Sequence, residues 1–231
     1  MNELLPTVNL MPRPVKTRPY DATRRREKAR ENRVRILDAA RRLFLADGYA
    51  RTSIAAVAEE AGVSPDLIYR HFGNKKGLVV ELLNYAVTGD LDSPKVLEQE
   101  RVRTTLDEPD QRRQLAMFAD DIADRVRRAQ AIDDVIRSAG EVDAEIAEMH
   151  AKMHRTRHRN IRGLVEAVAA HGPLRDGLDV ETATTTVWML VGPATRRQLV
   201  DGIGWSQEQY AAWLHDAVEN YLLGARNRTV E

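Results

Sequence analysis

Residues 54–72, IAAVAEEAGVSPDLIYRHF, contain two helical segments that are each too short to be stable alone. Between them, Gly62 can adopt the left-handed backbone of a tight turn, and the small side chain of Ala58 lets the two segments approach closely. Val57 and Ile68 can then fill the wedge between the segments. This is the pattern of a helix-turn-helix, whose second helix can lie in the major groove of DNA while the first crosses the phosphates.

The helix before this motif must complete its core, because the two short segments cannot bury enough apolar surface by themselves. Apolar residues recur at helical spacing over 24–46, and Asp47 with Gly48 can end that helix. A further helix is expected over 75–87. The sequence therefore predicts a three-helix head that continues into a fourth helix.

The two short helices carry start signals. Thr52 is expected to cap the first of them, which we place at 53–61. Ser64 is expected to cap the second, with Pro65 at the first helical position, where a missing N–H costs nothing. Free N–H groups at such a helix start can bind an anion.

The rest of the chain is also predicted to be helical, because few β-branched or aromatic residues alternate at period two. Four prolines interrupt the first twenty residues, and a polar stretch with Pro94 and Pro109, whose inner part can still be helical, follows the fourth helix. We therefore expect an all-α protein. Its expected units are a flexible basic arm (1–23), a helix-turn-helix head (24–88), a connecting segment (89–110), a larger helical domain (111–225) and a tail (226–231).

The charge of the chain is divided between its two ends. Residues 1–80 hold 16 Lys and Arg against 9 Asp and Glu, whereas residues 81–231 hold 19 against 26. Such asymmetry is typical of a chain whose first part meets a polyanion, although ordinary variation along a solvated surface also produces it. There is no cysteine and no apolar run long enough to span a bilayer, so we expect a soluble, cytoplasmic protein without disulfides.

Six fixed spacings stand out between residues 35 and 78. They join Leu43-Phe44 with Gly48-Tyr49, Thr52, Ala58 with Ala61-Gly62-Val63-Ser64, Tyr69 with His71-Phe72, and Lys75 with Leu78. In these residues the segment resembles the DNA-binding domain of the tetracycline-repressor (TetR) family. The resemblance covers about one fifth of the chain.

The resemblance implies which residues touch DNA. Four of them are expected at phosphates: Thr52, Tyr69, His71 and Lys75, the last as a mobile cation. Arg70 can give a guanine two hydrogen bonds, and Asp66 can accept one from a cytosine. The expected DNA-contacting residues are Thr52, Ser53, Ser64, Pro65, Asp66, Leu67, Tyr69, Arg70, His71 and Lys75.

Three histidines, His150, His154 and His158, follow one another at steps of four residues, which places adjacent pairs on one helix face. A metal ion could bridge such a pair, but the arginines interspersed with them would oppose a cation. The local signatures of hydrolases, nucleotide enzymes and zinc proteases are absent from the sequence. We therefore predict a protein that is not an enzyme, with no metal and no cofactor.

The resemblance also implies a small-molecule pocket and a dimer interface in the larger domain. Two closing helices are expected, over 179–200 and after Ser206. The expected pocket residues are Phe118, Ile122, His150, Met153, Trp188 and Met189, with plain core packing open for each. The expected interface residues are Val191, Tyr210, Trp213, Leu214, Ala217 and Tyr221, although Trp213 and Tyr221 could instead complete an intramolecular core.

These features predict a transcription regulator, specifically a repressor that binds a palindromic operator as a homodimer and is released by a small molecule. Two alternatives stay open. One is an activator or architectural DNA binder without a ligand, and the other is an enzyme or metal protein with an accessory DNA-binding head. The expected partners are double-stranded DNA, a second copy of the chain and an unidentified small molecule, but no membrane.

Overall fold

The computed structural model describes residues 19–225, with side chains from residue 23 onward, and its regular elements in that range are all helices. The head comprises α1 (Pro19–Arg51), α2 (Ile54–Ala61), α3 (Pro65–Phe72) and α4 (Lys75–Thr88). The larger part comprises η1 (Val96–Glu98), α5 (Glu100–Asp107), α6 (Gln111–Gly140), α7 (Ala144–His171), α8 (Val180–Leu190), α9 (Pro193–Arg196), the π-helix η2 (Arg197–Gly202) and α10 (Gln207–Leu223). The all-α prediction is confirmed.

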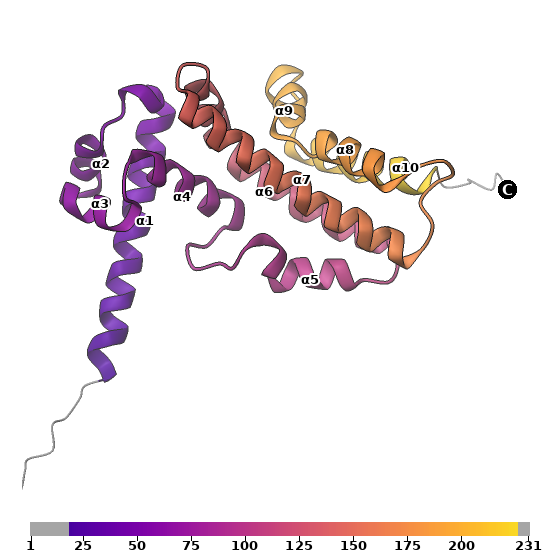
Figure 1. Ribbon diagram of the computed structural model, residues 1–231, viewed down its shortest axis with the longest axis horizontal. Helices are drawn as coiled ribbons and strands as arrows, with labels where there is room; N and C mark the ends of the chain where they lie inside the picture. Colours follow the sequence, from indigo (N-terminus) through magenta and orange to yellow (C-terminus); the bar gives the residue numbers. More distant parts are fainter. Residues whose placement is uncertain (1–18, 226–231) are drawn as a thin grey trace, which may run out of the picture.

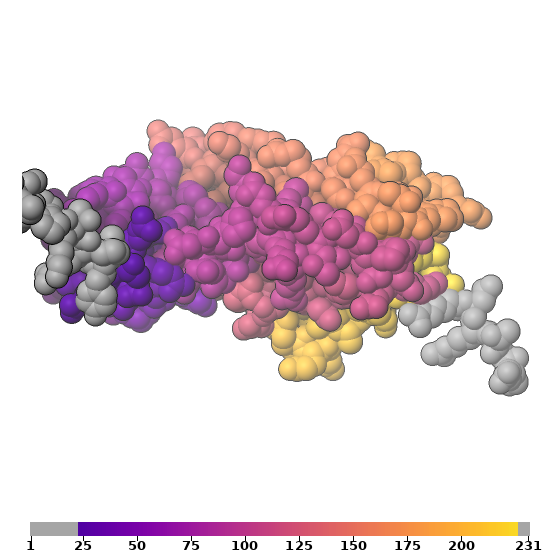
Figure 2. Space-filling model, turned by 90° about the horizontal axis from the view of Figure 1, so that it is seen from below, coloured from indigo at the N-terminus to yellow at the C-terminus, as the bar shows by residue number. Residues whose placement is uncertain are grey.

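The helices are arranged along one long axis. In Figure 1 the head lies at one end, α6 and α7 run side by side through the middle, and α8 and α10 pack at the other end. Figure 2 shows the connecting residues and α5 covering the middle of the lower face, between the head and the closing helices. Within residues 19–225 no helix has both the length and the apolar character needed to cross a membrane.

The first helix is longer at both ends than the sequence predicts. It begins at Pro19 rather than at residue 24, because a proline is well tolerated at a helix start. It also continues past the expected stop to Arg51, with a kink at Gly48, where φ is 78° and ψ is 169°. Residues 1–18 of the expected arm (1–23), and the tail (226–231), lie outside the described residues.

The turn between α2 and α3 forms as the sequence predicts, but the cap before it differs. Gly62 has the left-handed φ of 62°, and its N–H donates to the carbonyls of Ala58 and Glu59. The side chain that caps α2 is that of Ser53, which accepts from the N–H of Ala56, and not that of Thr52. Ser64 occupies the cap position of α3 without a side-chain hydrogen bond.

The head does not have a core of its own. Phe44 of α1 and Ile68 of α3 are buried in the same cluster as Ile132, Ile136 and Ile146 of α6 and α7. The larger part of the chain therefore supports the head directly, and a displacement of α6 or α4 can be transmitted to α3 through packed side chains.

The expected helix over 179–200 is interrupted. α8 ends at Leu190, and a short α9 and a π-helix follow. Pro193 explains the break, because it has no N–H and its ring would clash with the carbonyl of Met189 in a continuous helix. That carbonyl accepts instead from the Gly192 N–H and the Thr195 hydroxyl. The last helix starts as expected, with a reciprocal capping box between Ser206 and Gln209.

Candidate nucleic-acid interface and interior cavity

One face of α3 is open to solvent. Ile68 and Phe72 turn into the core, whereas Asp66, Arg70 and Tyr69 are exposed, with Tyr69 at 51%. The Asp66 and Arg70 side chains make no hydrogen bond or ion pair with any other described residue. An exposed carboxylate and an exposed guanidinium four residues apart on a helix lie on the same face, and both can read base edges in a major groove. Ser64 and Pro65 extend this exposed face to the start of the helix.

Thr52 and Lys75 have internal partners, which differs from the expectation of free phosphate contacts. Thr52 is 3% exposed, and its hydroxyl donates to the Gly48 carbonyl at 2.9 Å. Lys75 is not a mobile cation. Its ammonium donates to the carbonyls of Tyr49 (2.9 Å) and Thr52 (3.1 Å), and it lies 4.2 Å from the centre of the Tyr49 ring. Burial lowers the pKa of Lys75. These contacts hold the turn after α1 against the start of α4.

Two further expected contact residues lie at the edge of the exposed face. Leu67 is half-buried and packs against the head core. His71 is also half-buried, and burial, followed by the nearby charges of Arg33 and Arg70, lowers its pKa. A lowered pKa favours the neutral imidazole, whose N–H can still donate a hydrogen bond to a phosphate. Ser53, at the start of α2, is exposed.

The first turns of α1 carry a basic surface. Arg24, Arg26 and Lys28 are exposed, and this part of α1 projects beyond the rest of the head in Figure 1. Farther along the same helix, Arg30 pairs with Asp90 at 2.9 Å, which ties α1 to the end of α4. A projecting basic helix end can add sequence-independent attraction to a DNA backbone.

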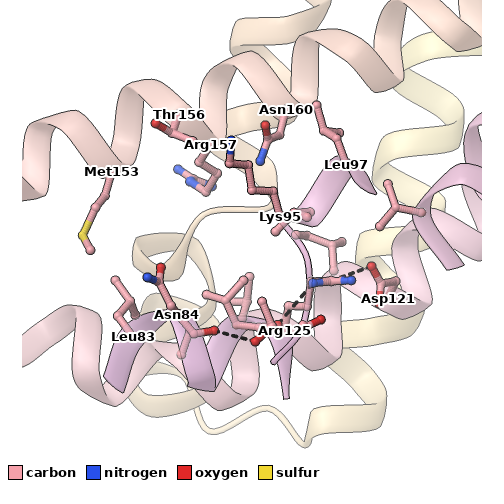
Figure 3. A pocket seen from close by; sticks show the side chains of 18 of the residues that line it. Leu83, Asn84, Lys95, Leu97, Asp121, Arg125, Met153, Thr156, Arg157 and Asn160 are labelled. Carbon is pink, nitrogen blue, oxygen red and sulfur yellow. Dashed lines mark hydrogen bonds and ion pairs between the residues drawn. The ribbon is translucent and has the colours of Figure 1, made fainter. Parts of the chain in front are cut away.

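A cavity of about 830 Å³ lies between α4, the connecting segment, α5, α6 and α7. Figure 3 shows side chains from several of these helices around it, among them Leu83 of α4 and Met153 of α7. The structure places half of the expected pocket residues on its wall. Those on the wall are Phe118, Ile122 and Met153. Those that do not line it are His150, Trp188 and Met189, the last of which is 58% exposed at the surface.

Arg125 links this cavity to the end of α4. Its guanidinium is buried on the cavity wall and donates to the Val87 carbonyl (3.2 Å), to Gln99 Oε1 (2.6 Å) and to Asp121 (2.6 Å). The ion pair with Asp121 is visible in Figure 3. Since the last carbonyls of a helix lack partners within the helix, a guanidinium at that point fixes the direction in which α4 ends.

Replacing Arg125 with methionine is expected to lower the free energy of unfolding by about 2 kcal/mol, because the Gln99 oxygen is left without its donor. The loss stays below that of a fully broken buried pair, since Asp121 keeps Arg101 and the Val87 carbonyl keeps Arg128. Urea unfolding measures this. Arg127→Met is the matched control, as its ion pair with Asp124 is half-exposed, and it should cost about 0.5 kcal/mol or less. Equal losses in the two variants would contradict the role given to Arg125.

Several cavity residues were not predicted from the sequence. The connecting segment contributes Leu91, Val96 and Leu97, although its overall polarity favours a simple linker. Val102 and Leu106, four residues apart on α5, were the available signal for a helix with an apolar face turned inward. The arginines that line the cavity are also hard to predict from the sequence, because an arginine usually indicates a solvated helix face.

Arg157 is one of these arginines. It lines the cavity, donates to the carbonyls of Trp188 (3.1 Å) and Val191 (3.3 Å), and stacks 4.7 Å from the Trp188 ring. Burial lowers the pKa of Arg157 to about 10. Its contacts hold Trp188 beside the cavity rather than in its wall.

The expected interface residues divide into two groups. Val191, Tyr210 and Leu214 have no exposed surface, because they pack inside the chain between α6, α8 and α10. These three are enclosed by their own chain in this conformation, which does not favour a place in an interface, and their role there stays a prediction. The residues that remain partly exposed are Trp213, Ala217 and Tyr221.

A family profile described as "Bacterial regulatory proteins, tetR family" matches residues 36–82. Over most of its length the chain is also similar to TtgR, an HTH-type transcriptional regulator of Pseudomonas putida. The two are 29% identical over 185 residues, which cover 77% of this chain and 84% of TtgR.

Two solved structures share the fold over most of the chain. NalD of Pseudomonas aeruginosa, the secondary repressor of the MexAB-OprM multidrug efflux pump, superimposes with a TM-score of 0.63 at 21% identity, covering 85% of this chain and 98% of NalD. SmeT, solved as a complex with triclosan, gives a TM-score of 0.64 at 20% identity, covering 87% of this chain and 97% of SmeT. The similarity therefore extends from the head through the larger helical part.

Proposed function

The chain belongs to the tetR family of bacterial regulatory proteins, and from this premise we propose that it is a repressor that binds a palindromic operator as a dimer and leaves it when a small molecule binds. The observation that carries the proposal is the exposed face of α3. There Asp66 and Arg70 are directed to solvent, without a partner among residues 19–225, on a helix-turn-helix that the family profile matches.

The proposed DNA interface has two kinds of residue. In the proposed interface, Asp66 and Arg70 face the base edges. The phosphates on either side are reached by Tyr69 and Ser53. A second group gives the head its shape instead of reaching out, because its polar atoms already have internal partners. This group consists of Thr52 and Lys75. Leu67 and His71 lie half-buried at the edge of the exposed face.

The proposed ligand site is the cavity behind α4. Its volume of about 830 Å³ lies within the range of small-molecule sites, which run from roughly 300 to 1,000 Å³. Apolar walls such as Leu83 and Phe118 favour an apolar, drug-sized molecule. α4 lines the cavity with residues of its second half and packs against α3. A ligand that fits only one position of α4 therefore shifts the position of α3. A ligand with equal affinity for both positions would shift nothing.

The proposed dimer uses the outer faces of α8 and α10. Met189 is exposed on α8, and Trp213, Ala217 and Tyr221 keep exposed surface on α10. A single head has only one short reading helix, and a two-fold dimer would place two of them about 34–36 Å apart, one turn of DNA. Tyr221 also donates to the Thr186 hydroxyl at 2.8 Å, which joins the two helices within one chain.

Selection of bound fragments from random double-stranded DNA tests this function. The full chain is expected to enrich a palindrome whose half-sites are one or more helical turns apart, and sedimentation is expected to give the mass of a dimer. Enrichment of a single, asymmetric site together with a monomeric mass would overturn the dimeric arrangement. If no salt-sensitive binding to any duplex is found, the regulatory function itself is excluded.

A further inference from the structure

Three side chains that can bind a metal ion meet where α6 packs against α7. Asp133 Oδ1 lies 2.9 Å from His150 Nε2 and 3.8 Å from His154 Nε2, and the two imidazole nitrogens lie 3.0 Å apart. Asp133 is buried, and Asp133 and His154 line the cavity. The three donor atoms thus form a small triangle at the edge of an interior space.

The size of this triangle matches the ligand spacing around a tetrahedral ion. Zinc binds nitrogen and carboxylate oxygen at about 2.0–2.2 Å, so two ligand atoms at a tetrahedral angle are about 3.4 Å apart. The observed separations of 2.9, 3.0 and 3.8 Å bracket that value. Two imidazoles with one carboxylate are a donor set that zinc and related transition metals use, with further positions left open.

Charges of both signs lie near the triangle. Asp133 is a buried carboxylate whose ion-pair partners in the described part of the chain are the two histidines alone. A buried carboxylate is stable when a positively charged group pairs with it or when it binds a metal ion. The positive charge of Arg157 acts on both Asp133 and His154 and opposes a cation, while its guanidinium donates to the carbonyls of Trp188 and Val191.

The His154 ring has few other partners. Its Nε2 faces the cluster, and its Nδ1 is buried without a hydrogen bond to any described residue. The third histidine of the sequence pattern stands apart, since His158 Nε2 lies 3.5 Å from the Thr185 hydroxyl. The helical spacing of histidines therefore identifies two of the ligands, and the packing of α6 on α7 supplies the third.

We propose that Asp133, His150 and His154 bind one divalent transition-metal ion of the zinc type, with an open coordination position toward the cavity. Such an ion would join α6 to α7 at the wall of the ligand site and offer a Lewis-acidic contact to an oxygen or nitrogen of a bound molecule. The ligands belong to the larger part of the chain, so binding of the ion can be measured without DNA.

The test uses the full chain, freed of metal with a chelator and titrated with Co²⁺ and then Zn²⁺. We expect one ion per chain, visible absorption bands of a low-coordinate cobalt site, and loss of these bands when zinc displaces cobalt. Zinc at 100 times its Kd is expected to raise Tm by about 5–10 °C. Absence of stoichiometric binding would overturn the proposal.

Three variants locate the site. Asp133→Asn and His150→Gln each remove one ligand with little change of shape, and each is expected to weaken zinc binding by at least roughly 100-fold. His158→Gln is the matched control on the same helix and should bind as the unchanged chain does. Circular dichroism shows which variants fold, and two ligand variants guard against the failure of one. If His158→Gln weakens binding as much as they do, the ion lies elsewhere.

Discussion

Replacing Gly77 with alanine is expected to destabilise the head by about 3 kcal/mol and to weaken binding to any operator. A Cβ added at Gly77 would lie 2.0 Å from the carbonyl oxygen of Phe72. Because that oxygen belongs to the backbone at the end of α3, no rotation of a side chain relieves the clash. Either α3 or the start of α4 must move, and the movement changes the angle at which α3 meets DNA.

Gly163→Ala is the matched control for this substitution. Gly163 lies inside α7, and a Cβ there would meet no atom within 4 Å outside its own helix and chain neighbours. This variant should therefore be more stable than the unchanged chain by about 0.5–1 kcal/mol, the usual difference between alanine and glycine in a helix. Urea unfolding and binding to the selected operator measure both effects. A Gly77→Ala protein as stable as Gly163→Ala would show that the α3–α4 junction is not closely packed.

The head could be predicted from the sequence because its signals are local. Gly62 can make the turn, Pro65 can start a helix, and the apolar residues between them have helical spacing. The shift of the cap from Thr52 to Ser53 is a displacement of one residue between two residue types that both cap helices. The hydrogen bonds from Lys75 to the carbonyls of Tyr49 and Thr52 could not be predicted in this way, because they join segments that are distant in the sequence.

The cavity was only partly predictable for the same reason. Hydrophobic spacing identified Phe118 and Ile122 as inward residues of α6, but it could not show that a polar connecting segment folds over them. The cluster at Asp133 is a similar case. Two of its members share one helix and a four-residue spacing, while the third comes from a neighbouring helix. Only the packing of α6 against α7 brings the three together.

The aromatic stripe of the last helix shows how one pattern permits two outcomes. Apolar spacing cannot distinguish a helix face that packs inside its own chain from one that packs against a second copy. Tyr210 and Leu214 are fully buried within the chain, whereas Trp213 is partly exposed and contacts the ring of Trp205 at 6.0 Å between centroids. The stripe is therefore divided between a core and the surface proposed for the dimer.

Replacing Arg70 with alanine is expected to weaken binding to the selected operator by about 2–6 kcal/mol per dimer, roughly 30-fold to 10⁴-fold. A bidentate contact between an arginine and a guanine contributes about 1–3 kcal/mol of discrimination, and a two-fold dimer carries the residue twice. The Arg70 guanidinium is exposed and has no hydrogen bond or ion pair with another described residue, so its removal breaks no such contact in that part of the chain. Unfolding by urea should consequently be almost unchanged.

If the loss of affinity depends on the DNA sequence, Arg70 reads a base and does not merely attract the DNA backbone. Arg159→Ala is the matched control, since it removes the same charge from an exposed position on α7, and operator binding should stay within about twofold of the unchanged chain. With Arg70→Ala, exchanging the contacted guanine for another base should carry little further cost, because the residue that distinguished it is gone. Fluorescence anisotropy at one fixed salt concentration measures how tightly the unchanged chain and Arg70→Ala bind the selected operator and the operator with the exchanged base. If Arg70→Ala instead weakens binding to random DNA and to the operator by the same factor, Arg70 contacts phosphates, and α3 lies in the groove differently from the arrangement proposed here.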